Sequence, residues 1–382
     1  MPATDILTPD LLERLRSRAA GYDETNSFFT EDLEELRAAG YLALFTPVAE
    51  GGAGLGFPDV VASQRMLAAA APATALAVNM HQVWCGVAHL LARQGDDSLA
   101  FVLKEAAAGE LFAFGVSEPG NPAVLFDSHT AARPTGDGGY AFTGTKIFTS
   151  LSPAWTRLGI FGKDTSAPED PRLVFGFADR GTAGITIADD WNTMGMRASQ
   201  SCTTRLDDAM VPAARMVRTT PVGPHRDAFV FGIFSLFETL LSAVYTGIGD
   251  RAVQLAADAA RGRRSPDGVP ASADPDTRWK VADAALRMDG AGLELDAVSR
   301  DLEEGTDHGS YWFPLLSGLK YRSTETARGV VETAMRVAGG RSYSRGQELE
   351  RLYRDVLAGM FHPSSEDSVH ASVANAVLGP VE

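Results

Sequence analysis

The spacing of apolar residues changes twice along this chain, and the two changes restrict the folds that the chain can adopt. Residues 1–111 repeat apolar side chains at helical spacing. Across residues 112–217 the period becomes two, in short runs that are mostly bounded by Gly, Pro, Asn or Asp. Residues 218–382 begin with a linker containing Pro and Gly and then return to helical spacing in four segments. This order predicts an α+β fold with three domains at those boundaries: N-terminal helices, a central antiparallel β domain and a C-terminal four-helix bundle.

Composition argues against several classes of function. The formal net charge of −15 disfavours a surface for nucleic acid or anionic membranes. The two cysteines, Cys85 and Cys202, predict no disulfide framework and suit a reducing cytoplasm. Three histidines are isolated, without metal-ligand spacing: His225, His308 and His370. The N-terminus lacks a basic and apolar leader, and we find no run of about 18 apolar residues that would span a membrane. We therefore expect a soluble cytoplasmic protein without a metal site.

Two strands in the central region end in groups suited to a flat polar ring. Residues 112–120 predict a short apolar strand that runs into a turn, and residues 140–150 predict a longer one. Their ends carry the hydroxyls of Ser117 and Ser150 and the aromatic edge of Phe148. A flavin is such a ring. Two ordinary core strands are the alternative interpretation.

Four stretches, in order and at fitting separations, resemble the signatures of one family. They are Val116-Ser117-Glu118-Pro119-Gly120; Gly144-Thr145-Lys146-Ile147-Phe148-Thr149-Ser150; Gly195-Met196-Arg197-Ala198-Ser199 with Val211-Pro212; and Ala338-Gly339-Gly340 with Leu349-Glu350-Arg351-Leu352-Tyr353-Arg354-Asp355. They look like motifs of the acyl-CoA dehydrogenase family. The resemblance covers nearly the whole chain, and it implies that fold, with FAD in a cleft between the β domain and the C-terminal bundle.

The resemblance also implies which residues hold the cofactor. The ring would be lined by Phe114, Val116, Ser117, Phe148 and Ser150, with Phe148 in place of a frequent Trp. The adenosine part of FAD, which in relatives reaches a second subunit, would meet Arg263, Gly339, Gly340 and Ser365. A solvated helix end is the alternative for Arg263. The usual Arg-x-x-Phe-Gly motif is replaced by Arg263-Arg264-Ser265-Pro266-Asp267, which puts the adenine contacts in question.

The usual catalytic base of the family is missing. Most relatives place a Glu after the Arg-Asp pair, and counting from Asp355 places Pro363 there. Glu238 is one substitute, because some relatives carry the Glu at the start of the first C-terminal helix; an exposed charge is its alternative. His362 is a second, because imidazole titrates near neutrality. His81 is a third, from the N-terminal domain, although a lone His on an apolar helix is often a core residue.

These residues leave three functions open. The leading prediction is α,β-dehydrogenation of an acyl thioester on CoA or a carrier protein, with an electron acceptor as partner. The second is a two-component flavin-dependent monooxygenase that receives reduced flavin from a reductase, because the Arg-Asp…His-Pro pattern looks like the monooxygenase variant of the fold. The third is a non-catalytic flavin-binding relative. The resemblance further implies a homodimer or homotetramer.

Overall fold

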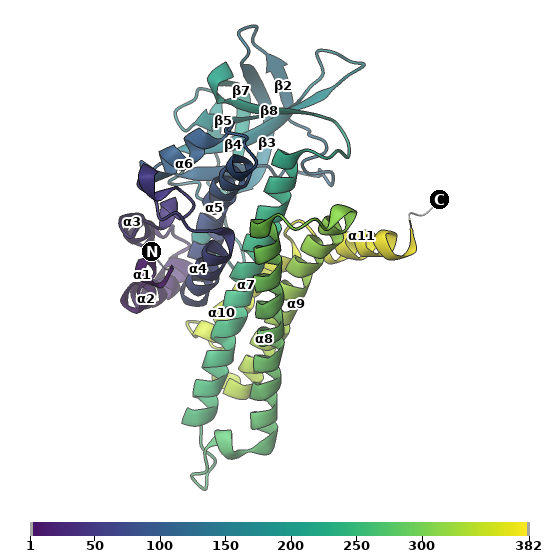
Figure 1. Cartoon of the computed structure of the whole chain (residues 1–382). Coiled ribbons are helices and arrows are strands. Elements are labelled where there is room, and N and C mark those ends of the chain that lie inside the picture. Colours follow the sequence, from purple (N-terminus) through teal and green to yellow (C-terminus); the bar gives the residue numbers. More distant parts are fainter. Residues whose placement is uncertain (1–2, 380–382) are drawn as a thin grey trace.

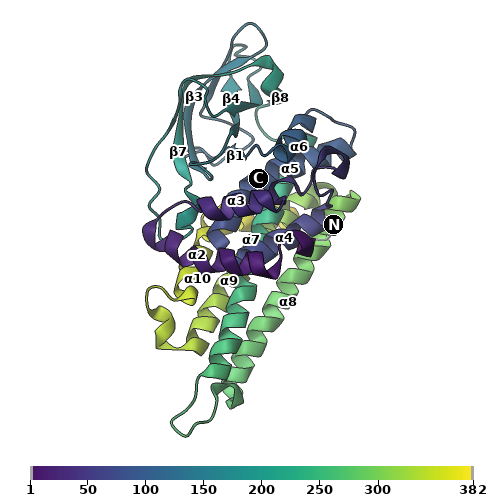
Figure 2. The ribbon, with the colours of Figure 1, turned by 90° about the vertical axis from the view of Figure 1, so that its left-hand side faces the viewer.

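The N-terminal part of the chain folds into helices. The computed structural model describes residues 3–379, and its first helices are α1 (Ala3–Ile6), α2 (Pro9–Thr25), α3 (Thr30–Ala38), α4 (Phe57–Ala70), α5 (Pro72–Arg93) and α6 (Ala100–Ala107). Helix α5 is buried along most of its length and contacts α4, α6 and the first strand of the sheet. Figure 2 shows α2 and α3 on the outer side of this layer. The N-terminal helices therefore cover one flank of both other parts.

The central part is one eight-stranded sheet with the order β6-β7-β3-β2-β4-β5-β8, in which β1 pairs with β4. The strands are β1 (Phe112–Gly115), β2 (Ala131–Pro134), β3 (Tyr140–Thr149), β4 (Arg157–Asp164), β5 (Arg172–Asp179), β6 (Ile185–Ile187), β7 (Cys202–Val211) and β8 (Met216–Pro221). The predicted antiparallel β domain is a mixed sheet: most strand pairs are antiparallel, but β1 and β4 are parallel and β2 and β4 share one parallel pair. A parallel pair needs a long crossover, and residues 116–156 supply it for β1 and β4.

The C-terminal part is built on three long helices that run away from the sheet (Figure 1). They are α7 (Ala228–Gly262), α8 (Pro275–Glu304) and α9 (Trp312–Ala338), followed by α10 (Glu348–Val356) and α11 (Glu366–Leu378). Helix α7 lies at the centre and contacts α4, α5, α8 and α9. A side chain at Gly247 would lie 2.3 Å from the Arg65 carbonyl oxygen, so glycine there permits the close contact with α4. The predicted α+β fold class is confirmed.

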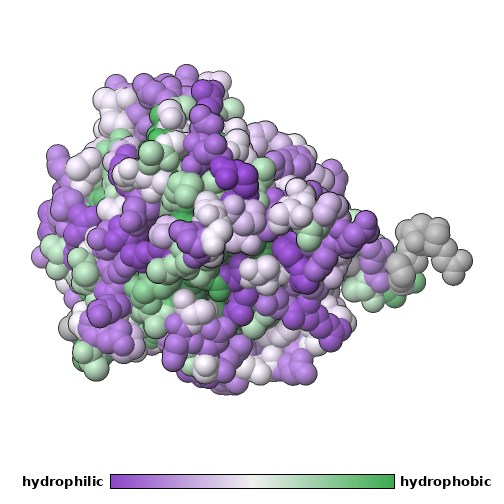
Figure 3. All heavy atoms as spheres, turned by 90° about the horizontal axis from the view of Figure 1, so that it is seen from above, coloured by the Kyte–Doolittle hydropathy of each residue, from purple (hydrophilic) through white to green (hydrophobic). Residues whose placement is uncertain are grey.

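Helix α7 bears on the expectation that no segment of the chain spans a membrane. Among the described residues it is the one helix that, by length and composition alone, could cross a membrane. However, 83% of its most apolar window is buried inside the molecule, as in the core helix of a bundle. Seen from the sheet end, the surface is mainly hydrophilic, with apolar residues scattered among polar ones (Figure 3).

Candidate active site

A β-bulge in β3 turns one aromatic side chain outward. The register of β3 against β7 shifts between Lys146 and Thr149, so that β3 carries one extra residue there. Phe148 lies in this bulge with φ at 57°, in the left-handed region that bulky residues rarely adopt. It is 56% exposed, and the Trp191 ring lies edge-on to it at 6.4 Å between centroids. The bulge thus presents the Phe148 ring instead of packing it into the sheet.

The segments beside the bulge are also strained and joined by hydroxyl groups. Three further non-glycine residues with positive φ lie here: Leu151, Met196 and Gln200. The Ser150 Oγ lies 2.8 Å from Ser201 Oγ, which lies 2.8 Å from Ser199 Oγ. All three serines are buried. Backbone strain of this kind clusters at functional sites, and it is maintained only where the surrounding structure enforces it.

A buried ion pair fixes the turn after β1 to β3. Lys146 Nζ lies 2.6 Å from the Glu118 carboxylate, and both side chains are inaccessible to solvent. The same carboxylate accepts hydrogen bonds from Ser128 Oγ (2.7 Å), His129 N (2.7 Å), Thr130 Oγ1 (2.6 Å), Thr130 N (3.1 Å) and Asn121 Nδ2 (2.9 Å). Burial opposes ionisation, but Lys146 and these donors outweigh it and lower the pKa of Glu118 to about 2. Glu118 is therefore a fully satisfied carboxylate.

The predicted residues of the first strand connect the sheet to α7. Phe114 is buried and stacks on Phe237 of α7 at 5.5 Å between centroids. Val116 is also buried, whereas Ser117 is half-buried and its carbonyl accepts a hydrogen bond from Ile147 N at 2.9 Å. Of these three residues, Ser117 is the one with a polar side chain, and it is partly exposed to solvent.

A second buried carboxyl lies on α7, next to the residue that contacts Phe114. Glu238 is completely buried; its Oε1 accepts a hydrogen bond from Ser364 Oγ at 2.5 Å. Its buried Oε2 has no hydrogen-bond partner within residues 3–379. Burial raises the pKa of Glu238 to about 8, although the Ser364 bond and the positive charge of Lys320 oppose the rise. This carboxyl is therefore mainly protonated at neutral pH, with one oxygen free.

Lys320 of α9 holds the segment that follows α10. Its ammonium donates to the carbonyl oxygens of Gly359 (2.7 Å), His362 (3.2 Å) and Ser364 (3.3 Å). Beside it is a hollow whose walls include Lys320, Thr324, Glu325, Gly359, Met360 and Ser364. The His362 ring meets the Tyr245 hydroxyl through Nδ1 at 2.9 Å, and burial, with the Lys320 charge, lowers its pKa to about 3. His362 is therefore neutral at pH 7.

These groups fit a flat heteroaromatic cofactor. The strained bulge supplies an open ring face at Phe148, the strand ends supply the hydroxyls of Ser117 and Ser150, and Glu238 has an unpartnered oxygen. A metal centre has no such support, since no group of three or more His, Cys, Asp or Glu able to hold a metal occurs in the described part of the chain.

Comparisons with known proteins agree with this arrangement. The family model of the acyl-CoA dehydrogenase N-terminal domain matches residues 11–110, and that of the C-terminal domain matches residues 239–366. The L-evernosamine nitrososynthase of Micromonospora sp. is 30% identical over 366 residues, covering 93% of this chain and 85% of that protein. The chain belongs to the acyl-CoA dehydrogenase family.

Two further relatives of this acyl-CoA dehydrogenase family member bear on its function. The Bacillus subtilis protein YdbM, provisionally named an acyl-CoA dehydrogenase, is 28% identical over 378 residues, covering 96% of this chain and 94% of that protein. The solved structure of KijD3 with FMN and dTDP-3-amino-2,3,6-trideoxy-4-keto-3-methyl-D-glucose is 26% identical with a TM-score of 0.86, covering 100% of this chain and 95% of that chain. A relative with a dehydrogenase name and a relative named as a nitrososynthase thus both match nearly the whole chain.

His81 is held in the core of this family member. Its Nε2 lies 2.7 Å from the Leu42 carbonyl oxygen, and its Nδ1 accepts the Phe112 N–H at 3.1 Å. The side chain is completely buried, and burial lowers the pKa of His81 to about 4. Because both ring nitrogens are engaged by backbone, this geometry gives no support to the catalytic role predicted for His81.

The residues predicted for the adenosine end of FAD do not all meet. Arg263 and Gly339 lie together. Arg263 Nη1 donates to Val337 O at 2.9 Å, and a Cβ atom at Gly339 would lie 3.2 Å from Arg263 Nη1. Gly340 follows directly in the chain. From Phe237 to Gly262, α7 rises about 38 Å at about 1.5 Å per residue, so this cluster lies far from the ring site of the same chain. Ser365 is apart from this cluster. Its neighbour Glu366 accepts a hydrogen bond from Tyr321 OH, and Tyr321 lies near the start of α9, whereas Gly339 follows the end of that helix.

Sequence reasoning missed Lys320, Ser364 and Tyr245. Each acts through a partner far along the chain, so spacing alone gave no indication of it. One signal was available, since Lys320 directly follows an apolar helical stripe that ends at Leu319, and a lysine at the edge of a buried stripe needs acceptors.

Proposed function

We propose that the protein is a flavin-dependent monooxygenase that oxidises a nucleophilic nitrogen of a small organic substrate. The observation that carries this proposal is the segment after α10, where Pro363 occupies the position of the usual base and His362 is neutral and bonded to Tyr245. A nitroso group is an amine nitrogen that has gained oxygen, so the nitrososynthase relative supports the same chemistry.

Bound reduced flavin would supply two electrons that activate O₂. With these electrons and two protons, one oxygen atom would enter an N–H bond of the substrate to give N–OH, and the other would leave as water. The protein has to hold the ring and exclude water. Phe148 would cover one part of the ring, and Ser117 and Ser150 would hydrogen-bond its polar edge. Glu238, mainly protonated and free at Oε2, would orient the amine by a hydrogen bond.

The cofactor best supported is FMN rather than the FAD predicted from the resemblance. Arg263, Gly339 and Gly340 lie together at the end of α7 that is far from the ring site, and the usual Arg-x-x-Phe-Gly motif is absent. FMN has no adenosine part and needs none of these residues. KijD3 binds FMN, which agrees with this choice. FAD would require the Arg263 cluster of a second subunit. A flavin reductase remains the predicted partner, and the cytoplasm the predicted location.

Dehydrogenation of an acyl thioester is the second candidate, because of Glu238. A base for that reaction must be a carboxylate in a water-poor site with a pKa near the working pH. Glu238 is buried on α7 with its pKa raised to about 8, and YdbM carries a dehydrogenase name. In this case an acyl thioester and an electron acceptor would be the partners.

One pair of assays separates the candidates. With photoreduced FMN, a panel of amines and ¹⁸O₂, we expect product that gains the mass of labelled oxygen, and no bleaching of oxidised flavin by acyl-CoA under anaerobic conditions. Bleaching by a thioester without oxygen uptake would reverse the assignment. The Glu238→Gln variant should lose activity in either case, whereas Glu332→Gln, which changes an exposed carboxylate on α9, should not. Mass analysis of the flavin released on denaturation decides between FMN and FAD.

We also propose self-association through α8. Trp279, Leu286 and Leu293 are 69–70% exposed and recur every seventh residue, on one face of the helix. In an antiparallel pair centred on Leu286, Trp279 of one copy meets Leu293 of the other, as a twofold interface requires. Leu286→Lys should therefore lower the mass measured by light scattering, and an unchanged mass would exclude this interface.

A further inference from the structure

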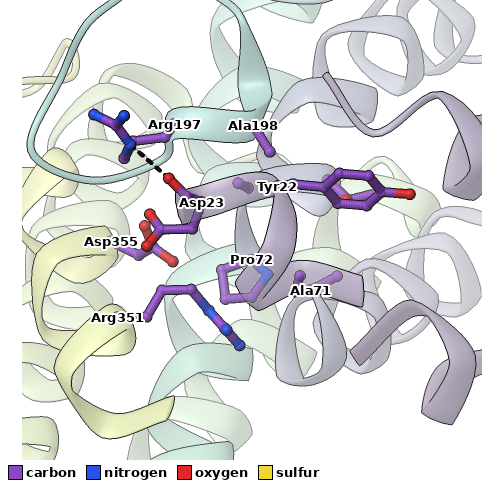
Figure 4. A pocket seen from close by; sticks show the side chains of 11 residues that line it. Tyr22, Asp23, Ala71, Pro72, Arg197, Ala198, Arg351 and Asp355 are labelled. Atoms are coloured by element: carbon purple, nitrogen blue, oxygen red, sulfur yellow. Dashed lines mark hydrogen bonds between the residues drawn. The ribbon is translucent and has the colours of Figure 1, made fainter. Parts of the chain in front are cut away.

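Four segments meet at a small hollow next to η3, whose neighbouring residues lie beside the Phe148 bulge (Figure 4). The residues that matter in the wall of this hollow are Asp23, Pro72, Thr74, Arg197, Arg351 and Asp355. They come from α2, the start of α5, the short 3-10 helix η3 (Arg197–Ser199) and α10. Figure 4 shows the Arg351 side chain directed toward the start of α5, at Ala71 and Pro72.

Arg351 carries a buried charge without a partner. The residue is 6% exposed, and its Nε is buried with no hydrogen-bond acceptor within residues 3–379. No carboxylate in the described part of the chain forms a salt bridge to it, unlike Arg354, three residues later. A buried cation is normally compensated by a counter-charge, because its removal from water is costly.

The start of α5 adds positive potential to the same hollow. Pro72 is the first helical residue and the N-cap Ala71 has no side-chain oxygen, so no side chain caps the helix. Pro72 has no N–H and Ala75 N donates to Ala71 O at 2.9 Å, so the N–H groups of Ala73 and Thr74 are the ones that could meet an external acceptor. At the N-terminus of a 22-residue helix these groups and the helix dipole favour negative charge.

The two acids in the wall are already committed. Asp23 accepts two hydrogen bonds from Arg354, at 2.8 and 2.5 Å. Asp355 accepts the Met196 N–H at 2.6 Å. Arg197 is also satisfied, since it donates to the Asp23 carbonyl oxygen at 2.7 Å and to Thr193 O at 3.0 Å. The positive groups that face the hollow are thus Arg351, whose Nε has no acceptor, and the first turn of α5, which no side chain caps; the charge of Asp355 acts on Arg351 without a direct bond.

We propose that this hollow binds a small inorganic anion between Arg351 and the N-terminus of α5. The anion would join α10 to α5 beside η3, whose neighbouring Met196 and Gln200 have strained backbones. Chloride, phosphate and a carboxylate share the required negative charge, and the hollow favours the smallest of them.

Thermal unfolding of the full-length protein tests the site. Sodium chloride, bromide, phosphate and acetate are compared with sodium gluconate at equal ionic strength, because gluconate is too large to enter. For the wild-type protein we expect chloride and bromide to raise Tm by about 2 °C over gluconate, and phosphate and acetate by less. Arg351→Met should abolish this rise, while Arg336→Met, which changes an exposed arginine of α9, should keep it. Equal Tm values of the wild-type protein in chloride and gluconate would overturn the proposal, as would a rise retained by Arg351→Met.

A second measurement keeps the site testable if Arg351→Met fails to fold. Crystals of the wild-type protein grown with bromide should show an anomalous peak within hydrogen-bond distance of Arg351 and the first turn of α5. Bromide peaks elsewhere and none in this hollow would also overturn the proposal.

Discussion

Two carboxyl groups near the candidate site are buried, one in the turn after β1 and one on α7, and they differ in almost every respect. Glu118, in the turn after β1, is surrounded by an ammonium, hydroxyls and N–H groups, and its pKa is lowered to about 2. Glu238, on α7, has one hydroxyl on one oxygen and nothing on the other, and its pKa is raised to about 8. The pair shows that burial alone does not decide the charge of a carboxyl; the donors around it do.

The difference indicates that the two carboxyl groups have different roles. A satisfied network such as that of Glu118 fixes positions, because every polar atom already has a partner. It ties the turn carrying Ser117 to the strand carrying Phe148. An unsatisfied group such as Glu238 keeps a free oxygen at a cost in stability, which is expected where a ligand or a proton is to be received. Each prediction below tests one side of this contrast.

Removing the cation beside Glu118 should have the largest effect. Lys146→Met leaves a buried carboxylate without its counter-charge, and we expect a loss of about 3–5 kcal/mol in the free energy of unfolding. Urea denaturation measures it. The double variant Glu118→Leu/Lys146→Met is the control and should recover much of the loss, since no charge then remains buried. A single variant that loses less than about 1 kcal/mol would contradict the proposed network.

The pH dependence of stability should have opposite signs for the two carboxyls. For Glu238 the folded protein holds a proton up to about pH 8, whereas the unfolded chain releases it near 4.5, so this group makes the protein less stable as pH rises through that window. Glu118 does the reverse and loses its contribution as pH falls from about 4.5 to about 2.

Glu238→Gln should therefore reduce the fall in unfolding free energy from pH 5 to pH 8, by up to about 1.4 kcal/mol per pH unit. Subtracting the variant from the wild-type curve cancels the contributions of groups that do not interact with Glu238, and leaves those of Glu238 and of Lys320, whose pKa depends on it. Glu332→Gln, at an exposed position, is the matched control. Identical slopes for wild-type protein and Glu238→Gln would mean that Glu238 is ionised in the folded state.

The same contrast shows how much of the fold and of the candidate site could be predicted from the sequence. Periodicity predicted the order of helices and strands, and the motif around residues 140–150 indicated that Phe148 and Ser150 belong together. Periodicity could not reveal the bulge or the parallel pairing of β1, which depend on the neighbouring strand. Nor could it reveal that Ser364 and Lys320 surround Glu238, because that contact forms only when α7, α9 and the segment after α10 pack together.

A substitution at Phe148, in the bulge that the Glu118 network holds in place, should have a smaller effect on stability. Phe148→Gly relieves a left-handed conformation that costs a bulky residue about 1–2 kcal/mol, but glycine loses more entropy on folding. We expect stability within about 1 kcal/mol of the wild-type protein and flavin affinity reduced about tenfold, since one ring contact is lost. Fluorescence titration with FMN measures the affinity, and Phe148→Trp should retain it. Unchanged affinity in Phe148→Gly would place the ring elsewhere.

The smallest effect is expected at the edge of the Glu238 cluster. Tyr245→Phe removes the hydroxyl bonded to His362 Nδ1 and should cost about 1 kcal/mol, the usual contribution of one hydrogen bond. Because Lys320 still binds the carbonyls of Gly359, His362 and Ser364, the segment should stay in place and its amide exchange should rise only near His362. Tyr41→Phe removes another buried hydroxyl bond, to Gln64, and should lower stability without changing exchange in this segment. If Tyr245→Phe instead raised amide exchange across the whole segment from 357 to 366, the position of this segment would depend on Tyr245 and not on Lys320. The free oxygen of Glu238 would then depend on the contact between Tyr245 and His362.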